Sequence, residues 1–466
     1  MSGLYDMFHP VLMIGDPELL KHILVKDFDH FVDRRLFMAE DGSLINEMLS
    51  NKTGDEWRAL RAVMTPTFTS GKMRSMFPLI CDKADSLVSF TLKEASQKPY
   101  VDMKVNFGRF TMDTIASCAF GIECNSFTSE VPEFAKLAKT FFDFSLIRLI
   151  KFTFLNMYPK ICNAIGIKIE PFSVKFFISV VEETIAARKA GQKRGDYLDL
   201  LLAARDGHLT QEVSTTHTQS TTTATENQVS ITHDSNALET NKTFITSSKQ
   251  VLTDRCIVAQ CVLFLIAGYD TTAAVLAFSA FLLAKHPVHQ QRLRQEVQQM
   301  VEEHGDITYQ GVMEAKFLDA CLMESMRLYP AGTFAERECT KTYKLPGTDV
   351  ILRPGDLVTI PIWSLHHDPR YWPAPEVFLP DRFLPENKSN ITNFTHMPFG
   401  MGPRSCIAMR FALMEAKVAL AKLILKAKLR LKSGHEEVKV ALSPVLLRPE
   451  GSIDVVITPL ATSTQN

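Results

Sequence analysis

A long apolar run restricts the folds open to this chain more than any other feature of its sequence. Residues 256–284 read CIVAQCVLFLIAGYDTTAAVLAFSAFLLA, and their length alone would suffice to cross a bilayer. However, Asp270, Thr271 and Thr272 lie near the middle of the run, where a charged side chain is costly in lipid. We therefore expect a helix buried at the centre of a large protein, with a polar notch halfway along it, and we disfavour a structural membrane protein.

The rest of the chain has mainly helical periodicity. Apolar residues recur at helical spacing in several long segments, among them 55–64, 80–95, 105–120 and 287–305. Residues 11–14, VLMI, have the length of a strand, and Asp16 and Pro17 are typical of the start of a helix that follows it. Residues 344–362 have the pattern of a hairpin. The sequence thus predicts a mainly α protein with small β-sheets, in the α+β class.

Residues 207–250 differ in composition from the rest of the chain. They are rich in Ser and Thr, poor in aromatic residues and without periodicity. Such a segment cannot bury enough apolar surface to offset the entropy that it would lose on ordering. We expect a disordered surface insert within a single domain that spans residues 1–466.

A second apolar segment, residues 141–169, is interrupted by basic residues and by Pro159. The basic residues are Arg148, Lys151, Lys160 and Lys168. This pattern favours helices that touch a membrane surface or pack in a core over a single spanning helix.

Charge and cysteine usage argue against two classes of protein. The formal net charge is −1 and the pI is about 6.9, so the chain lacks the basic excess of nucleic-acid-binding proteins, and we expect no nucleic acid as a partner. The nine cysteines include no CxxC pair. This usage predicts reduced thiols in a cytosol-facing protein rather than a disulfide framework.

Cys406 follows a loop rich in Gly and Pro, FGMGPRSC, and precedes a helical pattern that begins at Met409. The start of a helix offers free N–H groups and a favourable dipole to a thiolate. Gly400 and Gly402 would let the backbone approach a planar group closely. These residues by themselves leave three roles open for Cys406: an iron ligand, a nucleophile or an ordinary buried cysteine.

The same stretch resembles the haem-binding signature of the cytochrome P450 family, F-x-x-G-x-R-x-C-x-G. Phe399, Gly402, Arg404 and Cys406 match it, whereas Ala408 stands where Gly is usual. The resemblance implies the cytochrome P450 fold, with a long central helix over haem b (iron protoporphyrin IX). It also implies that Cys406 ligates the iron and that Phe399 packs beside the sulfur.

Two further motifs are similar to elements of that family. ESMR contains Glu324 and Arg327 and matches the E-x-x-R element. PDRF contains Arg382 and is similar to the P-E-R-F segment, with Asp381 in place of glutamate. Residues three apart on a helix share a face, so Glu324 and Arg327 can pair. The resemblance implies that these two residues and Arg382 form a buried structural network behind the haem.

The notch in the long apolar run, AGYDTT at residues 267–272, resembles the family's oxygen-activation stretch. Splitting dioxygen requires protons, which a hydroxyl beside an acid can deliver. The resemblance assigns this hydroxyl to Thr271 and the proton relay to Asp270. We also expect Gly268 and a threonine hydroxyl to distort the helix there and admit water.

Several cationic and aromatic side chains are expected to hold the haem propionates. Trp57 and Arg61 in DEWRALR lie four residues apart and so share a helix face. An indole N–H and a guanidinium both suit a carboxylate. The resemblance adds Arg404, Arg337 in FAERECT and Arg34 in DRR.

The resemblance also predicts a roomy apolar substrate pocket above the haem, roofed by residues 141–169. Its expected lining is Phe264, Ala267, Thr271, Ala331, Gly332 and Thr333.

Outside residues 207–250, the chain is most similar to the animal clan that holds the drug- and steroid-oxidising enzymes of family 3 and thromboxane synthase. The resemblance implies a monooxygenase that inserts one atom of O2 into lipophilic xenobiotics, steroids or fatty acids. Its electrons would come from NADPH through a separate cytochrome P450 reductase, with cytochrome b5 as an optional second donor. A peroxide isomerase of the thromboxane synthase type is the alternative. It needs no acid–threonine pair, so Asp270 and Thr271 favour oxygen activation.

Full-length relatives begin with an apolar anchor, a hinge, a helix and a first strand, and this chain starts after them. We expect an N-terminally shortened protein at the cytosolic face of the endoplasmic reticulum membrane, with weakened attachment. Residues 11–14 would then lack a neighbouring strand and form an exposed edge. A haem-binding but inactive isoform is a further alternative.

Overall fold

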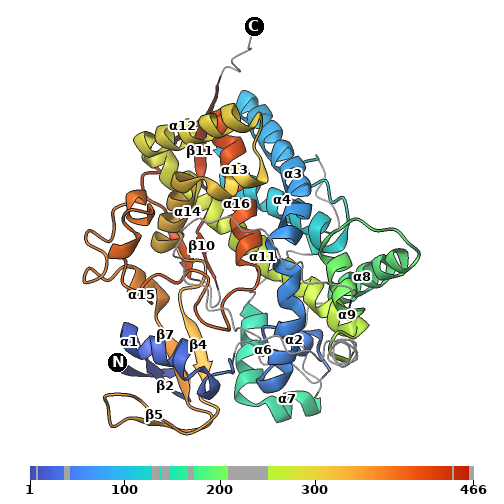
Figure 1. Cartoon of the computed structure of the whole chain (residues 1–466), viewed down its shortest axis with the longest axis vertical. Helices are drawn as coiled ribbons and strands as arrows, with labels where there is room; N and C mark the ends of the chain where they lie inside the picture. Colours follow the sequence, from blue (N-terminus) through green and yellow to red (C-terminus); the bar gives the residue numbers. More distant parts are fainter. Residues whose placement is uncertain are drawn as a thin grey trace, which may run out of the picture.

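The computed structural model describes residues 1–6, 9–35, 42–128, 134, 136–137, 146–165, 173–207, 250–442 and 446–460. Helices dominate it (Figure 1). The α-helices are α1 (Pro17–Lys21), α2 (Gly54–Met64), α3 (Ser70–Gln97), α4 (Met103–Ile115), α6 (Leu146–Met157), α7 (Pro159–Ile165), α8 (Val174–Lys189), α9 (Tyr197–Arg205), α11 (Asp254–Lys285), α12 (Pro287–His304), α13 (Tyr309–Glu314), α14 (Lys316–Leu328), α15 (Ile362–His366) and α16 (Met409–Lys426). Shorter helical turns are η1 (His22–Lys26), η2 (Phe28–His30), η3 (Leu44–Glu47), η4 (Thr65–Phe68), η5 (Ala116–Phe120), η7 (Pro380–Phe383) and η8 (Lys388–Asn390).

The longest described helix, α11, runs through the middle of the molecule (Figure 1). It packs against α4, α16, α14 and α9, and most of its side chains are buried by these contacts. Among the described helices it is the one long and apolar enough to cross a membrane, yet 61% of its most apolar window is buried inside the protein. Burial of apolar surface against other helices stabilises α11 without a bilayer. The prediction of a buried central helix is confirmed.

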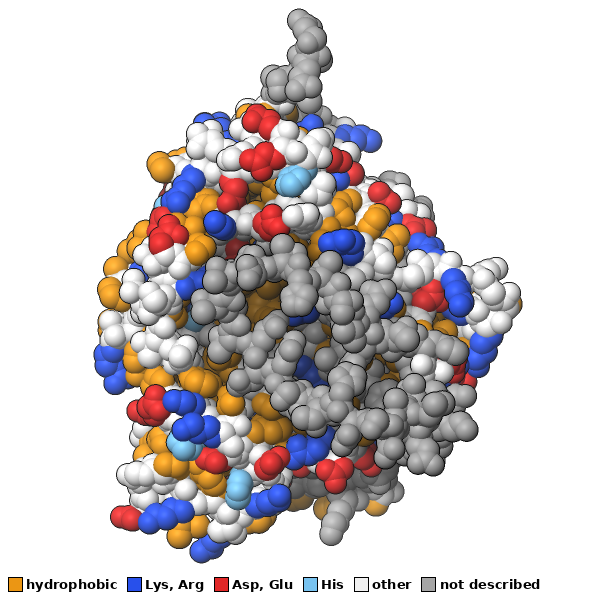
Figure 2. Space-filling model, viewed as in Figure 1, with side chains coloured by type: hydrophobic (Ala, Val, Ile, Leu, Met, Phe, Trp, Pro, Cys, Tyr) orange, Lys and Arg blue, Asp and Glu red, His pale blue; other side chains and the backbone are white. Residues whose placement is uncertain are grey.

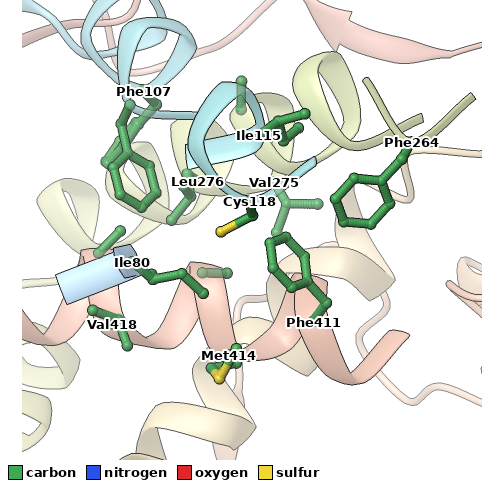
Figure 3. Close-up of a cluster of buried hydrophobic side chains, with 14 of the residues drawn as sticks. Ile80, Phe107, Ile115, Cys118, Phe264, Val275, Leu276, Phe411, Met414 and Val418 are labelled. Atoms are coloured by element: carbon green, nitrogen blue, oxygen red, sulfur yellow. The ribbon is translucent and has the colours of Figure 1, made fainter. Parts of the chain in front are cut away.

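The core is densest where α11 meets α4 and α16. The side chains labelled in Figure 3 are Ile80, Phe107, Ile115, Cys118, Phe264, Val275, Leu276, Phe411, Met414 and Val418. All of them are buried. Because α16 begins three residues after Cys406, its packing against α11 ties the cysteine loop to the central helix.

The described strands form small sheets. The four-stranded sheet has the order β1 (Ser2–Asp6), β2 (His9–Met13), β7 (Leu357–Ile360), β4 (Ala335–Glu338). A three-stranded sheet has the order β3 (Val101–Asp102), β11 (Asp454–Pro459), β8 (Ala427–Leu431). Two pairs complete the set, β5 (Tyr343–Lys344) with β6 (Ile351–Leu352) and β9 (Val440–Leu442) with β10 (Leu447–Pro449).

The expected exposed edge at residues 11–14 is wrong. Strand β2 lies between two partners: β1 pairs with it antiparallel, from Ser2 opposite Met13 to Asp6 opposite His9, and β7 pairs with it parallel. The segment SGLYD shows no apolar alternation, so the sequence gives little sign of a strand there. The free N–H and C=O groups of β2 nevertheless require partners, and the preceding residues supply them.

The hairpin expected over residues 344–362 exists only in its first half. Strands β5 and β6 pair antiparallel, with Tyr343 opposite Leu352. Strand β7 instead joins the four-stranded sheet between β2 and β4. Its buried Leu357, Val358 and Ile360 explain this choice, because a central position in a sheet removes more apolar surface from water than a hairpin edge does.

The start of α1 agrees with its prediction. The Asp16 side chain accepts hydrogen bonds from the N–H groups of Glu18 and Leu19, both at 3.0 Å, and Pro17 begins α1, as predicted.

The apolar segment 141–169 contains α6 and α7, which are separated at Pro159; residues 141–145 and 166–169 lie outside the described part. Residues 208–249 lie outside it as well, so the disordered insert stays a prediction.

The described surface mixes both signs of charge. On the face drawn in Figure 2, Lys and Arg side chains alternate with Asp and Glu, with apolar side chains between them. This distribution agrees with the near-neutral formal charge of the whole chain, which is −1.

Candidate functional site

Two glycines shape the loop that precedes α16. Gly400 and Gly402 adopt φ angles of +71° and +74°, which favour glycine. A Cβ atom on Gly402 would lie 1.9 Å from the carbonyl oxygen of Leu24, so no other residue fits against that backbone. The N–H of Cys406 donates to the carbonyl of Phe399 at 2.8 Å and closes the loop. Cys406 is therefore held in a tight turn directly before a buried helix.

The sulfur of Cys406 lies in unusual surroundings. Of the nine cysteines, Cys406 alone is exposed. The surrounding protein still reduces its solvation and raises the pKa of the thiol, while the Ala408 N–H, Arg61 and Arg34 act in the opposite direction. An accessible sulfur near a backbone N–H and two cations is a suitable ligand for a metal once it is deprotonated. Ala408 has a φ of −93°, which an L-residue adopts freely, so the departure from Gly is tolerated.

Arg404 connects the cysteine loop to two neighbouring segments. Its donors reach the carbonyl oxygens of Val32, Leu49 and Lys52 at 2.9, 3.3 and 2.7 Å. Its guanidinium carbon lies 4.1 Å from the ring centre of Trp57, in a cation–π contact. Burial lowers the pKa of Arg404 to about 9. The guanidinium is thus largely engaged by the protein's own backbone.

Trp57 and Arg61 lie on the face of α2 that meets this loop. Trp57 is buried beneath Arg404, and Arg61 is half-buried. The Nη1 atom of Arg61 donates to the carbonyl of Ser405 at 3.0 Å. Helix α2 therefore brings an indole and a second guanidinium to the residue next to Cys406.

Arg34 and Arg337 are enclosed cations without an ion pair among the described residues. Burial, followed by repulsion from Arg61, lowers the pKa of Arg34 to about 10. Burial, followed by repulsion from Arg34 and Arg404, also lowers the pKa of Arg337. The Nε atoms of Arg34 and Arg337 have no hydrogen-bond partner among the described residues. A buried donor without a hydrogen-bond partner is costly, and a carboxylate is a suitable acceptor for a guanidinium, so the cluster would suit the carboxylates of a haem.

One short segment of the central helix, residues 267–271, is partly exposed to solvent; we call it the open step. Ala267 is exposed and residues 268–271 are half-buried, whereas residues 272–284 are all buried. The Thr271 hydroxyl donates to the carbonyl of Ala267 at 2.5 Å. The open step coincides with the AGYDTT stretch, so the structure leaves this part of α11 accessible to a ligand.

The expected distortion of this helix is not seen. Helix α11 is α-helical from Asp254 to Lys285 without interruption. Gly268 has a different use: a Cβ atom there would lie 2.6 Å from Cδ1 of Ile115 on α4. The glycine lets α4 and α11 approach closely, and the Thr271 hydroxyl bonds within its own helix instead of opening it.

Asp270 faces two cations that the sequence does not reveal. Its Oδ2 lies 3.5 Å from Nη1 of Arg448 in β10, and Lys104 of α4 lies close enough to influence its charge. Burial raises the pKa of Asp270, and these two cations oppose the rise. Nothing in the sequence marks Arg448 or Lys104 as neighbours of Asp270, since both are far from α11 along the chain.

Phe264, which was predicted to line the substrate pocket, is buried in the hydrophobic core. Its side chain is 6% exposed, and its ring centre lies 4.6 Å from Tyr197, 5.0 Å from Phe411 and 6.1 Å from Phe68. Phe264 shares a helix face with Thr271 but lies about 10 Å earlier along the axis. At that level α9 and α16 close over it, so Phe264 belongs to the core (Figure 3).

The loop containing Ala331, Gly332 and Thr333 joins α14 to β4 and is half-buried. Its carbonyls accept hydrogen bonds from Leu447 and Trp363 at 2.8 and 2.9 Å, which fix its backbone. The next residue, Phe334, is 49% exposed and was not predicted as a site residue. Its exposure is visible only in the structure, and no motif in the sequence indicates it.

The structure brings Glu324, Arg327 and Arg382 together. Arg327 donates to both carboxylate oxygens of Glu324, at 2.7 and 2.9 Å, and both side chains are fully buried. The Nε atom of Arg382 lies 3.4 Å from Glu324. Arg382 also donates to the carbonyls of Pro373 and Ala374, at 2.6 and 3.0 Å. The network anchors the segment before the cysteine loop to α14.

The accessible Cys406 and the neighbouring cations would suit a haem, and the comparisons with known proteins agree with this. A family model described as cytochrome P450 matches residues 1–231 and 209–457. The chain is 37% identical to cytochrome P450 9e2 of Blattella germanica over 452 residues, covering 93% of this chain and 80% of that protein. It is 35% identical to cytochrome P450 3A41 of Mus musculus over 430 residues, covering 91% and 77%. It is 34% identical to cytochrome P450 3A31 of Mesocricetus auratus over 466 residues, covering 98% and 84%.

The chain therefore belongs to the cytochrome P450 family. The predicted fold class, haem b as the cofactor and a P450 monooxygenase as the class of enzyme are confirmed.

Proposed function

We propose that this enzyme inserts one atom of O2 into lipophilic xenobiotics, steroids or fatty acids, with electrons that NADPH supplies through cytochrome P450 reductase. The observation that carries the proposal is the accessible Cys406 sulfur beside Arg34 and Arg61. When bound, haem b supplies the redox chemistry with dioxygen, and the protein binds, orients and donates protons.

Cys406 is the proposed iron ligand, and the cations around it are the proposed partners of the propionates. Arg34 and Arg337 each keep a buried Nε atom without a partner among the described residues, which suits them to bind an incoming carboxylate. Arg61 and Trp57 contribute from α2. Arg404 acts chiefly by holding the loop, because its donors bond to the backbone.

Thr271 and Asp270 are the proposed proton donors to dioxygen. The Thr271 hydroxyl stands at the accessible step of α11, where it can hold a proton next to the ligand. The raised pKa of Asp270 favours retention of a proton closer to neutral pH, as a relay requires. A peroxide isomerase needs no such pair, so these residues favour the monooxygenase over the isomerase.

The proposed location is the cytosolic face of the endoplasmic reticulum membrane. The exposed apolar residues of α6 and α7 support contact with a membrane surface; they are Ile147, Ile150, Phe154, Ile161 and Ile165. Membership of the cytochrome P450 family supports a redox partner in general. The proposed partner is cytochrome P450 reductase, with cytochrome b5 as an optional second donor. The lipophilic substrate would contact Ala267, Ala331, Gly332 and Thr333.

The identity of the iron ligand is tested by spectroscopy of the purified holoprotein. Reduction with dithionite followed by carbon monoxide should move the Soret maximum to longer wavelength, because a thiolate ligand would donate charge to the iron. Cys406→Ser should abolish this band. Cys81→Ser, at a half-buried cysteine on α3, is the matched control and should keep it. A band that survives in Cys406→Ser would refute the assignment.

The reaction is tested with the reductase, NADPH and a steroid as a lipophilic probe. Hydroxylated steroid that depends on both O2 and NADPH is expected. Thr271→Ala should consume NADPH without a matching yield of product, whereas Thr271→Ser should retain coupling. A holoprotein with the correct carbon monoxide band but no product with a panel of lipophilic probes would favour the inactive isoform.

A further inference from the structure

A second cavity lies on the flank of α11, apart from the cysteine loop. Its volume is about 260 Å³, and it is enclosed by α4, α11 and β10. Its polar lining includes Lys104, Arg109, Asp270 and Arg448. Its apolar lining includes Val105, Met112, Ala273, Ala274 and Pro449. Asp270 is the one residue of the proposed haem site that also lines this cavity.

The cavity carries more positive than negative charge. Lys104, Arg109 and Arg448 line the cavity together with one carboxylate, that of Asp270, while Asp102 outside the lining also acts on Lys104. The excess affects Lys104 directly: burial is the largest cause of its lowered pKa, and repulsion from Arg448 is the next. An anion that entered the cavity would relieve this repulsion.

Arg109 is the cation that remains available. Lys104 donates to the carbonyls of Pro449 and Gly451 at 2.8 and 3.0 Å, and Arg448 lies 3.5 Å from Asp270. Arg109 has a cation–π contact with Phe90, at 4.8 Å, and no ion pair with any described residue. Its guanidinium lines the cavity, and none of its donors has a hydrogen bond to the described part of the chain.

We propose that this cavity binds a small organic monocarboxylate, whose carboxylate pairs with Arg109 and Arg448 and whose short apolar tail lies on Met112, Ala273 and Ala274. The Asp270 carboxylate already lies among these cations, so the site suits this group. The volume falls just below the range of about 300–1,000 Å³ typical of sites for drug-sized ligands, which limits the tail to a few carbons. The apolar lining favours such a ligand over inorganic phosphate.

A bound carboxylate would compete with Asp270 for Arg448. Occupancy of the cavity therefore changes the charges around Asp270, which stands next to Thr271 at the open step of α11. The cavity thus acts as an effector site that modulates proton delivery. This last consequence rests on the proposed function, whereas binding itself does not.

Binding is measured by isothermal titration calorimetry of the holoenzyme with hexanoate, and inorganic phosphate serves as a tail-less probe. Hexanoate should bind, and Arg109→Met should weaken it by about tenfold, because a charge-assisted hydrogen bond is lost. Arg109→Lys should retain most of the affinity. Asp270→Asn should bind hexanoate more tightly, because the competing carboxylate is gone.

The control is Arg74→Met, which removes another arginine in contact with an aromatic ring, Tyr309 at 5.3 Å, outside the cavity. It should bind hexanoate like the wild type. Unaltered affinity in Arg109→Met, weaker binding in Asp270→Asn, or phosphate binding tighter than hexanoate would each overturn the proposal. If hexanoate shifts the Soret band and binds Arg109→Met as tightly as the wild type, it occupies the haem pocket. This outcome would also overturn the proposal. A correct carbon monoxide band in these variants keeps this test separate from that of the iron ligand.

Discussion

Single residues shape the cysteine loop through steric fit as well as through chemistry. Gly402 and Gly355 both adopt a positive φ, of +74° and +94°. A Cβ atom on Gly402 would meet the Leu24 backbone at 1.9 Å, whereas nothing lies within 4 Å of one on Gly355. The two positions therefore separate the cost of a left-handed backbone from the cost of a collision.

We predict that Gly402→Ala destabilises the protein far more than Gly355→Ala. The left-handed conformation costs about 1–2 kcal/mol for an alanine, and this is the whole expected effect at Gly355. At Gly402 the backbone of η1 must also move, so at least about twice that loss is expected. Urea unfolding of both variants measures the difference, and the carbon monoxide band reports the loop. Equal losses of unfolding free energy in the two variants would show that the backbone around Gly402 moves at little cost.

Position along a helix decided which of the predicted site residues lie close together. Glu324 and Arg327 lie three apart on one helix, so their pairing follows from helix geometry alone. Phe264 lies seven residues before Thr271 and therefore on the same helix face. It nevertheless lies in the core, because Tyr197 of α9 and Phe411 of α16 pack against it. Helical spacing specifies a face, and packing decides what that face meets.

At the scale of elements, the contact of α4 with α11 depends on Gly268. The glycine lies where a Cβ atom would be 2.6 Å from Cδ1 and 3.4 Å from Cγ1 of Ile115. Removal of Cδ1 alone, in Ile115→Val, would therefore leave room for an alanine at position 268.

We predict that Gly268→Ala and Ile115→Val are coupled. Gly268→Ala should cost about 1–3 kcal/mol through overpacking, less up to about 1 kcal/mol gained in helix propensity. Ile115→Val alone should cost about 0.5–1.5 kcal/mol. The double variant should be more stable than the sum of the two losses indicates, because the collision is gone. A double-mutant cycle by urea unfolding measures this, and strict additivity would contradict the close contact.

Strand pairing belongs to the same scale. Strand β1 was not recognisable from the pattern of SGLYD, and β7 was expected in a hairpin but occupies a central position in the sheet. Short strands are specified by the partners that the rest of the fold offers, and the local sequence carries little of that information.

At the scale of the whole molecule, two neighbouring histidines favour their neutral form: His366 is buried and His396 is half-buried. The rings of His366 and His396 stack at 5.1 Å, and Nε2 of His366 accepts a hydrogen bond from the N–H of Met397 at 2.9 Å. Burial lowers the pKa of His396 to about 3 and also lowers that of His366. Arg327 is close to both rings and adds to the effect.

We predict that the protein loses stability as the pH falls below about 6.5, the ordinary value for histidine. The folded-state pKa is below that of the unfolded chain, so the unfolded chain binds more protons in this range and the free energy of unfolding decreases. The loss is on the order of 1 kcal/mol per pH unit for each histidine.

Unfolding by urea at pH 7 and pH 5 measures this effect. His396→Gln should reduce the pH dependence, whereas His304→Gln, at the end of α12, is the control and should leave it unchanged. An identical pH dependence in wild type and His396→Gln would exclude His396 as the cause.

The sequence by itself determined those features that depend on neighbours along the chain. It predicted the buried central helix from its apolar length and central charge, the start of α1 from Asp16 and Pro17, and the cysteine loop from its glycines. In each case a local rule, of periodicity, capping or backbone freedom, was sufficient.

Only the tertiary structure decided which distant groups meet. Contacts between segments far apart in the sequence place Arg448 and Lys104 beside Asp270. They also bring Arg109 into the second cavity and bury Phe264. Such contacts follow from how the apolar faces of all the helices are buried together. A single sequence specifies that arrangement only collectively, and no local pattern contains it.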